Sequence, residues 1–196
     1  MSVLSSTDRA PLIVFLLALG LATPFALSTQ NHEFVFYVAV LVLLAVFVGY
    51  VHARVGLHPL SLWALTAWAL AHLAGGLLLV SDEVGVLYNW WIVPGRLKYD
   101  QLVHAFGFGT STWVAWQGLR HGLADPRPTL GGVFLAACVG MGLGACNEVV
   151  EFFATLWVPE TNVGGYVNTG WDLVANAVGC ALAAALIWRF GRRAAV

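Results

Sequence analysis

Charged residues are scarce in this sequence of 196 residues: Asp, Glu, Lys and Arg make up 10% of it, against 60% for hydrophobic residues. A soluble domain carries roughly 25% charged residues. Together with a mean hydropathy of +0.81, this predicts an integral membrane protein and excludes an ordinary soluble domain. A basic excess is also absent, since the net charge is -1. We therefore expect no nucleic-acid partner.

Cysteine and familiar catalytic motifs are also scarce. The three cysteines, Cys138, Cys146 and Cys180, lie in apolar runs, and their spacing matches no zinc motif. We interpret them as small core residues. The chain has no HExxH, rhomboid or phosphatase signature. Only Arg9 forms a positive region before the first apolar run, and no A-x-A-like cleavage site follows. The first run is therefore predicted to be an uncleaved span.

Long apolar runs dominate the rest of the chain, and a helix needs about 20 apolar residues to cross a bilayer. The runs predict an all-α, polytopic membrane helix bundle with about six transmembrane helices and a single membrane domain over residues 1–196. The segment 81–99 is amphipathic and rich in Trp, which favours an interfacial lid or half-helix. The expected spans are residues 11–27, 34–50, 60–80, 100–118, 130–158 and 171–190.

Basic residues are distributed unevenly between the two sides of this predicted bundle. With six spans, both termini lie on one side, and only Arg96 and Lys98 lie on the other. Lys and Arg are enriched in cytoplasmic loops. We therefore expect a multi-pass protein of the bacterial inner (plasma) membrane with cytoplasmic N and C termini. The basic residues of the cytoplasmic side are Arg9, Arg54, Arg120, Arg127, Arg189, Arg192 and Arg193.

Two carboxylates, Glu148 and Glu151, interrupt the apolar run of residues 130–158 in the stretch NEVVE. A spacing of three residues puts both on one helix face. An ionised carboxylate in an apolar environment is costly unless it is paired, protonated or bound to a metal. The stretch therefore predicts a functional site, for which a structural polar network is the alternative.

Two other helices carry polar pairs that the predicted orientation places near the same, outer face. Each pair is spaced by four residues and so shares one face of its helix. At 1.5 Å per residue, all these groups fall within roughly 15 Å of the outer boundary. We therefore expect a pocket of carboxylates and imidazole that faces the periplasm or exterior. The pairs are Asp100 with His104 and Asp172 with Asn176.

Helix bundles build metal sites from carboxylate and His side chains at such spacings. An imidazole with carboxylates suits Zn, Mn or Fe, and an all-oxygen set suits Mg or Ca. The expected cofactor is a divalent metal (Zn, Mn, Fe or Mg). The candidate metal ligands are His104, Glu148, Glu151 and Asp172; the candidate catalytic residues are Asp100, Glu148 and Glu151. The candidate substrate-binding residues are Asn176, Arg96, Lys98, His72 and Asn147.

Simpler roles are open for several of these residues. Asp100 and Asp172 suit helix N-caps. His104 and His72 suit hydrogen-bonded or packed interior positions. Arg96 and Lys98 have stems long enough to reach the interface or an anionic lipid headgroup.

The order and spacing of these residues resemble a family pattern. The matching text is Asp100-QLV-His104, then Glu148-VV-Glu151-FF, then NTGWDLVANAVG with Asp172 and Asn176. This pattern is similar to that of the YjdF-type inner-membrane family of unknown function (the DUF2238 group) and of the VanZ-like membrane proteins. The resemblance covers residues 99–179. It implies a cell-envelope location and a site, but no defined reaction.

Three functions are compatible with the predicted pocket. The first is a metal-assisted enzyme acting on a lipid or lipid-linked envelope substrate, with membrane lipids as partners. The second is a small proton- or cation-coupled transporter, although no charged residue is predicted deep in the inner halves of the helices. The third is a non-catalytic envelope scaffold. The oligomeric state is left open.

Overall fold

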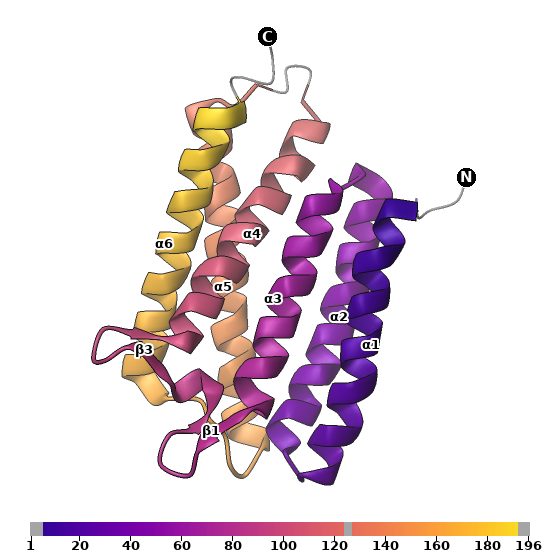
Figure 1. The fold of residues 1–196 in the computed structure, drawn as a ribbon. Coiled ribbons are helices and arrows are strands. Elements are labelled where there is room, and N and C mark those ends of the chain that lie inside the picture. Colours follow the sequence, from indigo (N-terminus) through magenta and orange to yellow (C-terminus); the bar gives the residue numbers. More distant parts are fainter. Residues whose placement is uncertain (1–5, 124–126, 192–196) are drawn as a thin grey trace.

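The computed structural model describes residues 6–123 and 127–191 and consists of six long helices with two short β-hairpins (Figure 1). Arg192 and Arg193, which contribute to the predicted basic side, lie outside the described residues. The long helices are α1 (Ser6–Ser28), α2 (His32–Val55), α3 (Pro59–Leu77), α4 (Tyr99–His121), α5 (Leu130–Trp157) and α6 (Gly165–Gly191). The all-α bundle predicted from the sequence is confirmed.

Local sequence signals explain where the helices begin and end. The Asn31 side chain accepts a hydrogen bond from the Phe34 N–H at 3.0 Å and caps α2. Gly56 ends α2 in a left-handed conformation, φ 67°, which glycine adopts without strain. Pro59 opens α3, where its missing N–H costs nothing. The Thr129 side chain caps α5.

Segment 81–99 differs from the half-helix that its composition suggested. It contributes to two antiparallel hairpins joined by a short 3-10 helix, η1 (Leu87–Asn89). Gly85 and Gly95 have positive φ angles of 76° and 68°, which permit the tight reversals. The chain reverses at these two turns and therefore cannot form a continuous helix, although the segment is amphipathic. The strands are β1 (Leu79–Ser81), β2 (Gly85–Val86), β3 (Trp91–Val93) and β4 (Leu97–Lys98).

Both hairpins lie at one end of the bundle, and the start of α1 and the end of α6 lie towards the other (Figure 1). We call that other end the terminal end. Within the described residues, five helices are long and apolar enough to cross a membrane: α1, α2, α3, α5 and α6. Helix α4 has 23 residues and is about 35 Å long, but it carries more polar residues than these five helices. It packs against α3, α5 and α6, so neighbouring helices shield its polar groups from lipid.

Helices α4 and α6 approach each other closely. A Cβ atom added to Gly179 would lie 1.9 Å from the Ala105 carbonyl oxygen, and one added to Gly144 of α5 would lie 2.7 Å from Asn176 Nδ2. Only glycine permits the backbone contact at Gly179, and Gly144 leaves room for the Asn176 side chain. The close approach brings polar side chains of α4, α5 and α6 together at the hairpin end of the bundle.

Candidate metal centre

His104 of α4 lies at the centre of the polar cluster. Its side chain is buried, and its Nδ1 lies 3.1 Å from Oδ1 of the fully buried Asn176 on α6. An amide oxygen only accepts hydrogen bonds, so this contact places the ring proton on Nδ1. The lone pair of a neutral His104 is then on Nε2, the nitrogen that remains for a metal.

Three carboxylates surround this imidazole at distances just beyond those of hydrogen bonds. Nε2 of His104 lies 3.6 Å from Asp100 Oδ1 and 3.7 Å from Glu151 Oε1. Glu148 Oε1 lies 3.5 Å from Nδ1. Two ligand atoms on a tetrahedral Zn²⁺ are separated by about 3.4 Å, because each lies 2.0–2.2 Å from the ion. The spacing of Asp100 and Glu151 from Nε2 therefore suits atoms that share a cation.

His104 belongs to two groups of potential ligands. In each group one ligand atom from each residue lies within 4.8 Å of those from the other two. The first group is Asp100, His104 and Asp172, and the second is His104, Glu148 and Glu151. Each offers one imidazole and two carboxylates, which leaves a coordination position for water or substrate.

Several buried polar atoms in this cluster have no hydrogen-bond partner among the described residues. They are both carboxylate oxygens of Glu148, Oδ1 of Asp172 and Nδ2 of Asn176. Asp172 is fully buried, and 7% of the Glu148 side chain is exposed. A buried polar atom without a partner costs about 1–3 kcal/mol, and an ionised one costs more. The residues present therefore fit a positively charged ligand.

Asn168 links this cluster to the basic side chains near the hairpins. Its Nδ2 donates to Asp172 Oδ2 at 2.5 Å and to Asp100 Oδ2 at 3.3 Å. Its Oδ1 accepts from Lys98 Nζ at 3.3 Å, and that ammonium lies 5.4 Å from the centroid of the Trp91 ring. On the α5 side, Asn147 Nδ2 donates to Glu151 Oε1 at 2.8 Å.

A cavity of about 470 Å³ adjoins the cluster at Asn168. We call it the headgroup cavity. It carries two cationic side chains beside two indoles, a lining that suits an anionic group at a membrane interface. Its lining includes Trp91, Arg96, Lys98, Asn168 and Trp171.

The comparison with protein families agrees with this architecture. The family model described as a predicted membrane protein family, DUF2238, matches residues 10–193. The chain belongs to the DUF2238 family. Comparisons with curated proteins and with solved structures gave no match. The resemblance to VanZ-like proteins stays a prediction.

The structure of this DUF2238 member brings together six residues that the sequence singled out: Asp100, His104, Glu148, Glu151, Asp172 and Asn176. Asn147 and Lys98 join them through Glu151 and Asn168, respectively. Arg96 lines the headgroup cavity. Their metal-binding, catalytic and substrate-binding roles stay predictions.

His72 of α3 contacts aromatic side chains. Its Nδ1 is hydrogen-bonded to the Tyr88 hydroxyl, and its ring lies against Phe34, Tyr37 and Tyr88. Burial, followed by the charges of Asp100 and Glu151, raises the pKa of Tyr88 well above its usual range. The phenol therefore stays protonated and donates to His72. This contact favours the packing role of His72 over substrate binding.

Several polar contacts were missed from the sequence, and three of them involve buried carboxylates or the cluster. The predicted span began at residue 171 and therefore left Asn168 outside the helix, whereas α6 begins at Gly165. The spacing of four residues between Asn168 and Asp172 could have indicated that the two share a helix face. Glu33, buried at the start of α2, accepts two hydrogen bonds from Asn162, at 2.9 and 2.8 Å. Nothing in the sequence pairs two residues so far apart.

The third missed contact lies near the opposite end of the bundle. The carboxylate of Asp8 is 3.5 Å from Nε2 of His52, and both side chains are buried. It joins the first helix to the end of the second. No local pattern pairs Asp8 with this imidazole, since the two lie on different helices.

Proposed function

We propose that this integral membrane protein binds a divalent metal ion in the cluster around His104 and uses it to act on the phosphate-bearing headgroup of a lipid or lipid-linked substrate. His104 Nε2 is the nitrogen ligand, with carboxylates of Glu148, Glu151 and Asp172 around it. Asp100, which lies 3.6 Å from the same nitrogen, is a further ligand or accepts a proton from the reacting water.

The observation that carries the proposal is the set of buried carboxylate oxygens without hydrogen-bond partners in the described chain, on Glu148 and Asp172. Four carboxylates surround one imidazole, and Lys98 reaches them through Asn168. A concentration of negative charge in a buried site requires protons or a cation. The spacing around His104 suits a cation shared between ligands.

The headgroup cavity supports the choice of substrate. Arg96 and Lys98 are suited to an anionic phosphate, and Trp91 and Trp171 are typical of the depth of lipid headgroups. A bound divalent cation polarises a phosphate or activates a water molecule. In this account Asn168 holds Asp100 and Asp172 in place, while Lys98 neutralises charge at the entrance.

Orientation is part of the proposal. The basic residues Arg54, Arg120 and Arg189 lie towards the end of the bundle that holds both termini, and the cluster lies towards the other end. The bias in Lys and Arg favours a cytoplasmic location for the terminal end. The cluster then faces the periplasm or exterior of a bacterial inner membrane.

A conducting role is less well supported. Asp8 and His52 lie near the terminal end, and an apolar layer packs along α1, α2 and α3 between them and the hairpin end. Its buried members include Phe15, Leu19, Leu41 and Leu73. The buried members of this layer that the structure describes are apolar, so a proton or cation has no polar groups to follow along this route.

Metal analysis of the purified protein tests the proposal. We expect about one equivalent of a divalent metal per chain in the parent protein and its loss in Glu148→Gln and Glu151→Gln. Glu160→Gln, which makes the same change at an exposed position outside the cluster, should retain the metal. A parent protein that binds no added Zn²⁺, Mn²⁺, Fe²⁺ or Mg²⁺ would contradict the proposal.

A further inference from the structure

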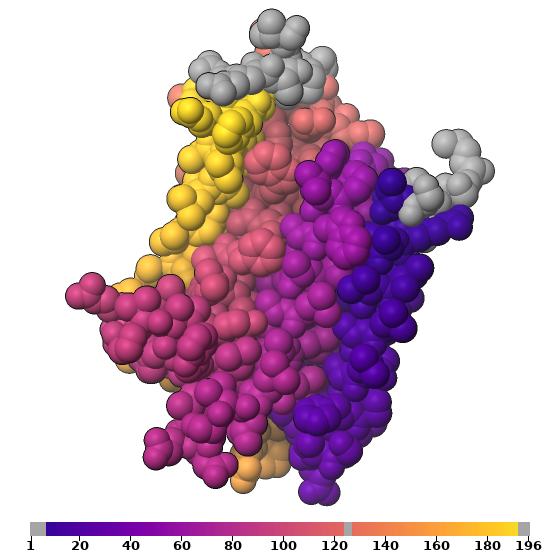
Figure 2. All heavy atoms as spheres, in the orientation of Figure 1, coloured from indigo at the N-terminus to yellow at the C-terminus, as the bar shows by residue number. Residues whose placement is uncertain are grey.

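A second cavity lies on the side of the bundle, well separated from the headgroup cavity. It has a volume of about 670 Å³ and lies between α3 and α6, over α4. We call it the lateral groove. Figure 2 shows atoms of α4 between those of α6 and α3, on the face where the groove lies. None of the residues around His104 that form the proposed metal centre lines it.

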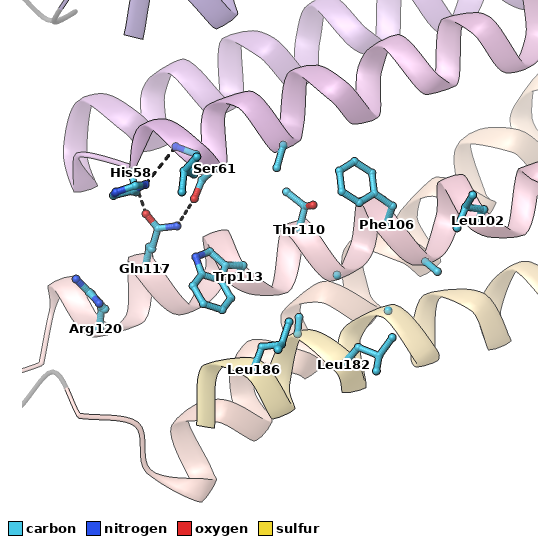
Figure 3. A pocket seen from close by; sticks show the side chains of 16 residues that line it. His58, Ser61, Leu102, Phe106, Thr110, Trp113, Gln117, Arg120, Leu182 and Leu186 are labelled. Carbon is cyan, nitrogen blue, oxygen red and sulfur yellow. Dashed lines mark hydrogen bonds between the residues drawn. The ribbon is translucent and has the colours of Figure 1, made fainter. Parts of the chain in front are cut away.

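The groove is apolar along most of its length. Its lining on α4 runs from Leu102 to Arg120, which corresponds to about 27 Å along the helix. The hydrocarbon core of a bilayer is about 30 Å thick. Its walls carry Phe106, Leu182 and Leu186, and Thr110 is a polar side chain near the middle (Figure 3). The groove therefore lies at the depth of lipid acyl chains.

Polar side chains gather at one end, the end nearer the chain termini (Figure 3). The His58 backbone N–H donates to Gln117 Oε1 at 2.8 Å, and Gln117 Nε2 donates to Ser61 Oγ at 2.6 Å. His58 Nδ1 accepts from the Leu60 N–H at 3.2 Å, so its Nε2 carries the ring proton and can donate. The exposed Arg120 guanidinium lies at the same end.

We propose that the lateral groove binds an anionic glycerophospholipid of the leaflet on the side of the termini. The phosphate lies against Arg120 and the Nε2–H of His58, and one acyl chain lies along α4 towards Thr110. That stretch of ten residues is about 15 Å long, which is half the thickness of the hydrocarbon core. Within the described residues no carboxylate pairs with Arg120, so its charge is available for a phosphate.

Charge complementarity selects the lipid over a second copy of the chain. The groove presents a cation and an N–H donor at headgroup depth and an apolar channel below them. An anionic lipid matches both features at once. A transmembrane helix of a second copy would cover the apolar channel but would leave the guanidinium without a partner.

Native mass spectrometry of delipidated protein, titrated with phosphatidylglycerol or with phosphatidylcholine of the same chains, tests the proposal. The parent should prefer phosphatidylglycerol, and Arg120→Gln should lower that affinity about fivefold. It should lower phosphatidylcholine binding less, because the choline cation of that lipid offsets the charge of its phosphate. Ala64→Phe, which fills the groove beside α4, should lower the binding of both lipids.

Matched variants control for charge and bulk elsewhere. Arg189→Gln removes an exposed cation at the same end of the bundle, and Ala53→Phe adds the same bulk at an exposed site on α2; both should bind lipid as the parent does. Repeating the titration in a Lys98→Gln background, which weakens the headgroup cavity, should leave the effect of Arg120→Gln unchanged, and this separates the two proposals. Equal binding of both lipids by the parent, or an equal loss in Arg189→Gln, would overturn the assignment. So would a dimer that Ala64→Phe converts to a monomer, because the groove would then hold a second copy.

Discussion

Asn176 Oδ1 lies 3.1 Å from His104 Nδ1, and this contact turns Nε2 of the imidazole towards Asp100 and Glu151. An outer hydrogen bond of this kind fixes the ring orientation and the tautomer of a metal-binding histidine. The two residues come from α4 and α6, the helices that approach most closely at Gly179. The position of the ring thus depends on the packing of this helix pair.

Asn176→Leu should lower metal affinity about 10- to 100-fold, the usual effect of losing a contact that orients a ligand. The change keeps the side-chain size and removes the acceptor. Titration with Zn²⁺ or Mn²⁺ measures it. Cys180→Ala alters a buried position one turn further along α6 and should leave the affinity unchanged. If both variants weaken binding equally, the effect comes from packing and not from the histidine.

Glu148→Gln should stabilise the metal-free protein, although it abolishes metal binding. It replaces a buried carboxylate, whose oxygens have no hydrogen-bond partner among the described residues, with a neutral group of the same shape. Each kcal/mol gained raises the melting temperature by about 2–4 °C for a chain of this size. Thermal unfolding in the presence of a chelator measures the shift, with Glu160→Gln as the control.

A lower melting temperature of metal-free Glu148→Gln would show that the carboxylate is needed for structure alone. The scaffold interpretation predicts that result, because a polar network that only holds helices together weakens when one member is removed.

Lys98→Gln should weaken the binding of a soluble phosphate headgroup about fivefold, the value expected for one cation near a membrane surface. The ammonium lies beside Trp91 and donates to Asn168 at the entrance to the cluster. Calorimetric titration with glycerol phosphate measures the change. Arg54→Gln removes a cation that lies over the Tyr50 ring, far along α2, and an equal loss in this variant would contradict a specific site.

Tyr88→Phe should destabilise the protein by about 1–3 kcal/mol, because it leaves His72 Nδ1 without its donor. Metal affinity should be unaffected. Burial raises the pKa of Tyr88, so the folded state favours the protonated phenol. Its contribution to stability is complete below the ordinary tyrosine pKa of about 10 and is lost as the pH rises above it.

Thermal unfolding between pH 7 and 11 tests this dependence. The parent should lose stability above about pH 10, and Tyr88→Phe should lose less over the same range. Tyr166→Phe, at a side chain that is 93% exposed, should follow the parent. A parent and a Tyr88→Phe variant with identical pH profiles would rule out the proposed hydrogen bond as a source of stability.

Helix periodicity and charge were sufficient to predict the bundle and most of the cluster. Spacings of three or four residues placed Asp100 with His104 and Glu148 with Glu151 on single helix faces, and the alternation of spans brought those faces to one end. These inferences succeed because a membrane limits the chain to regular helices of nearly fixed length.

Contacts that depend on loop conformation were beyond such reasoning. The hairpins depend on the positive φ angles of Gly85 and Gly95. The amphipathic pattern that suggested a half-helix contains no information on these two turns. Asn168 was missed because the Gly-rich stretch before residue 171 was interpreted as a loop, although it forms the first turns of α6. The pairing of Glu33 with Asn162 joins residues 129 positions apart, and no local pattern encodes it.

X-ray absorption spectroscopy of the metal-loaded protein tests the central proposal most directly. With one equivalent of Zn²⁺ bound, the account predicts a first shell of one imidazole nitrogen and at least two carboxylate oxygens at about 2.0–2.2 Å. The scattering from the imidazole ring, which identifies a histidine ligand, should be lost in His104→Ala. A shell containing sulfur at about 2.3 Å, or a spectrum of Zn²⁺ that His104→Ala leaves unchanged, would contradict it.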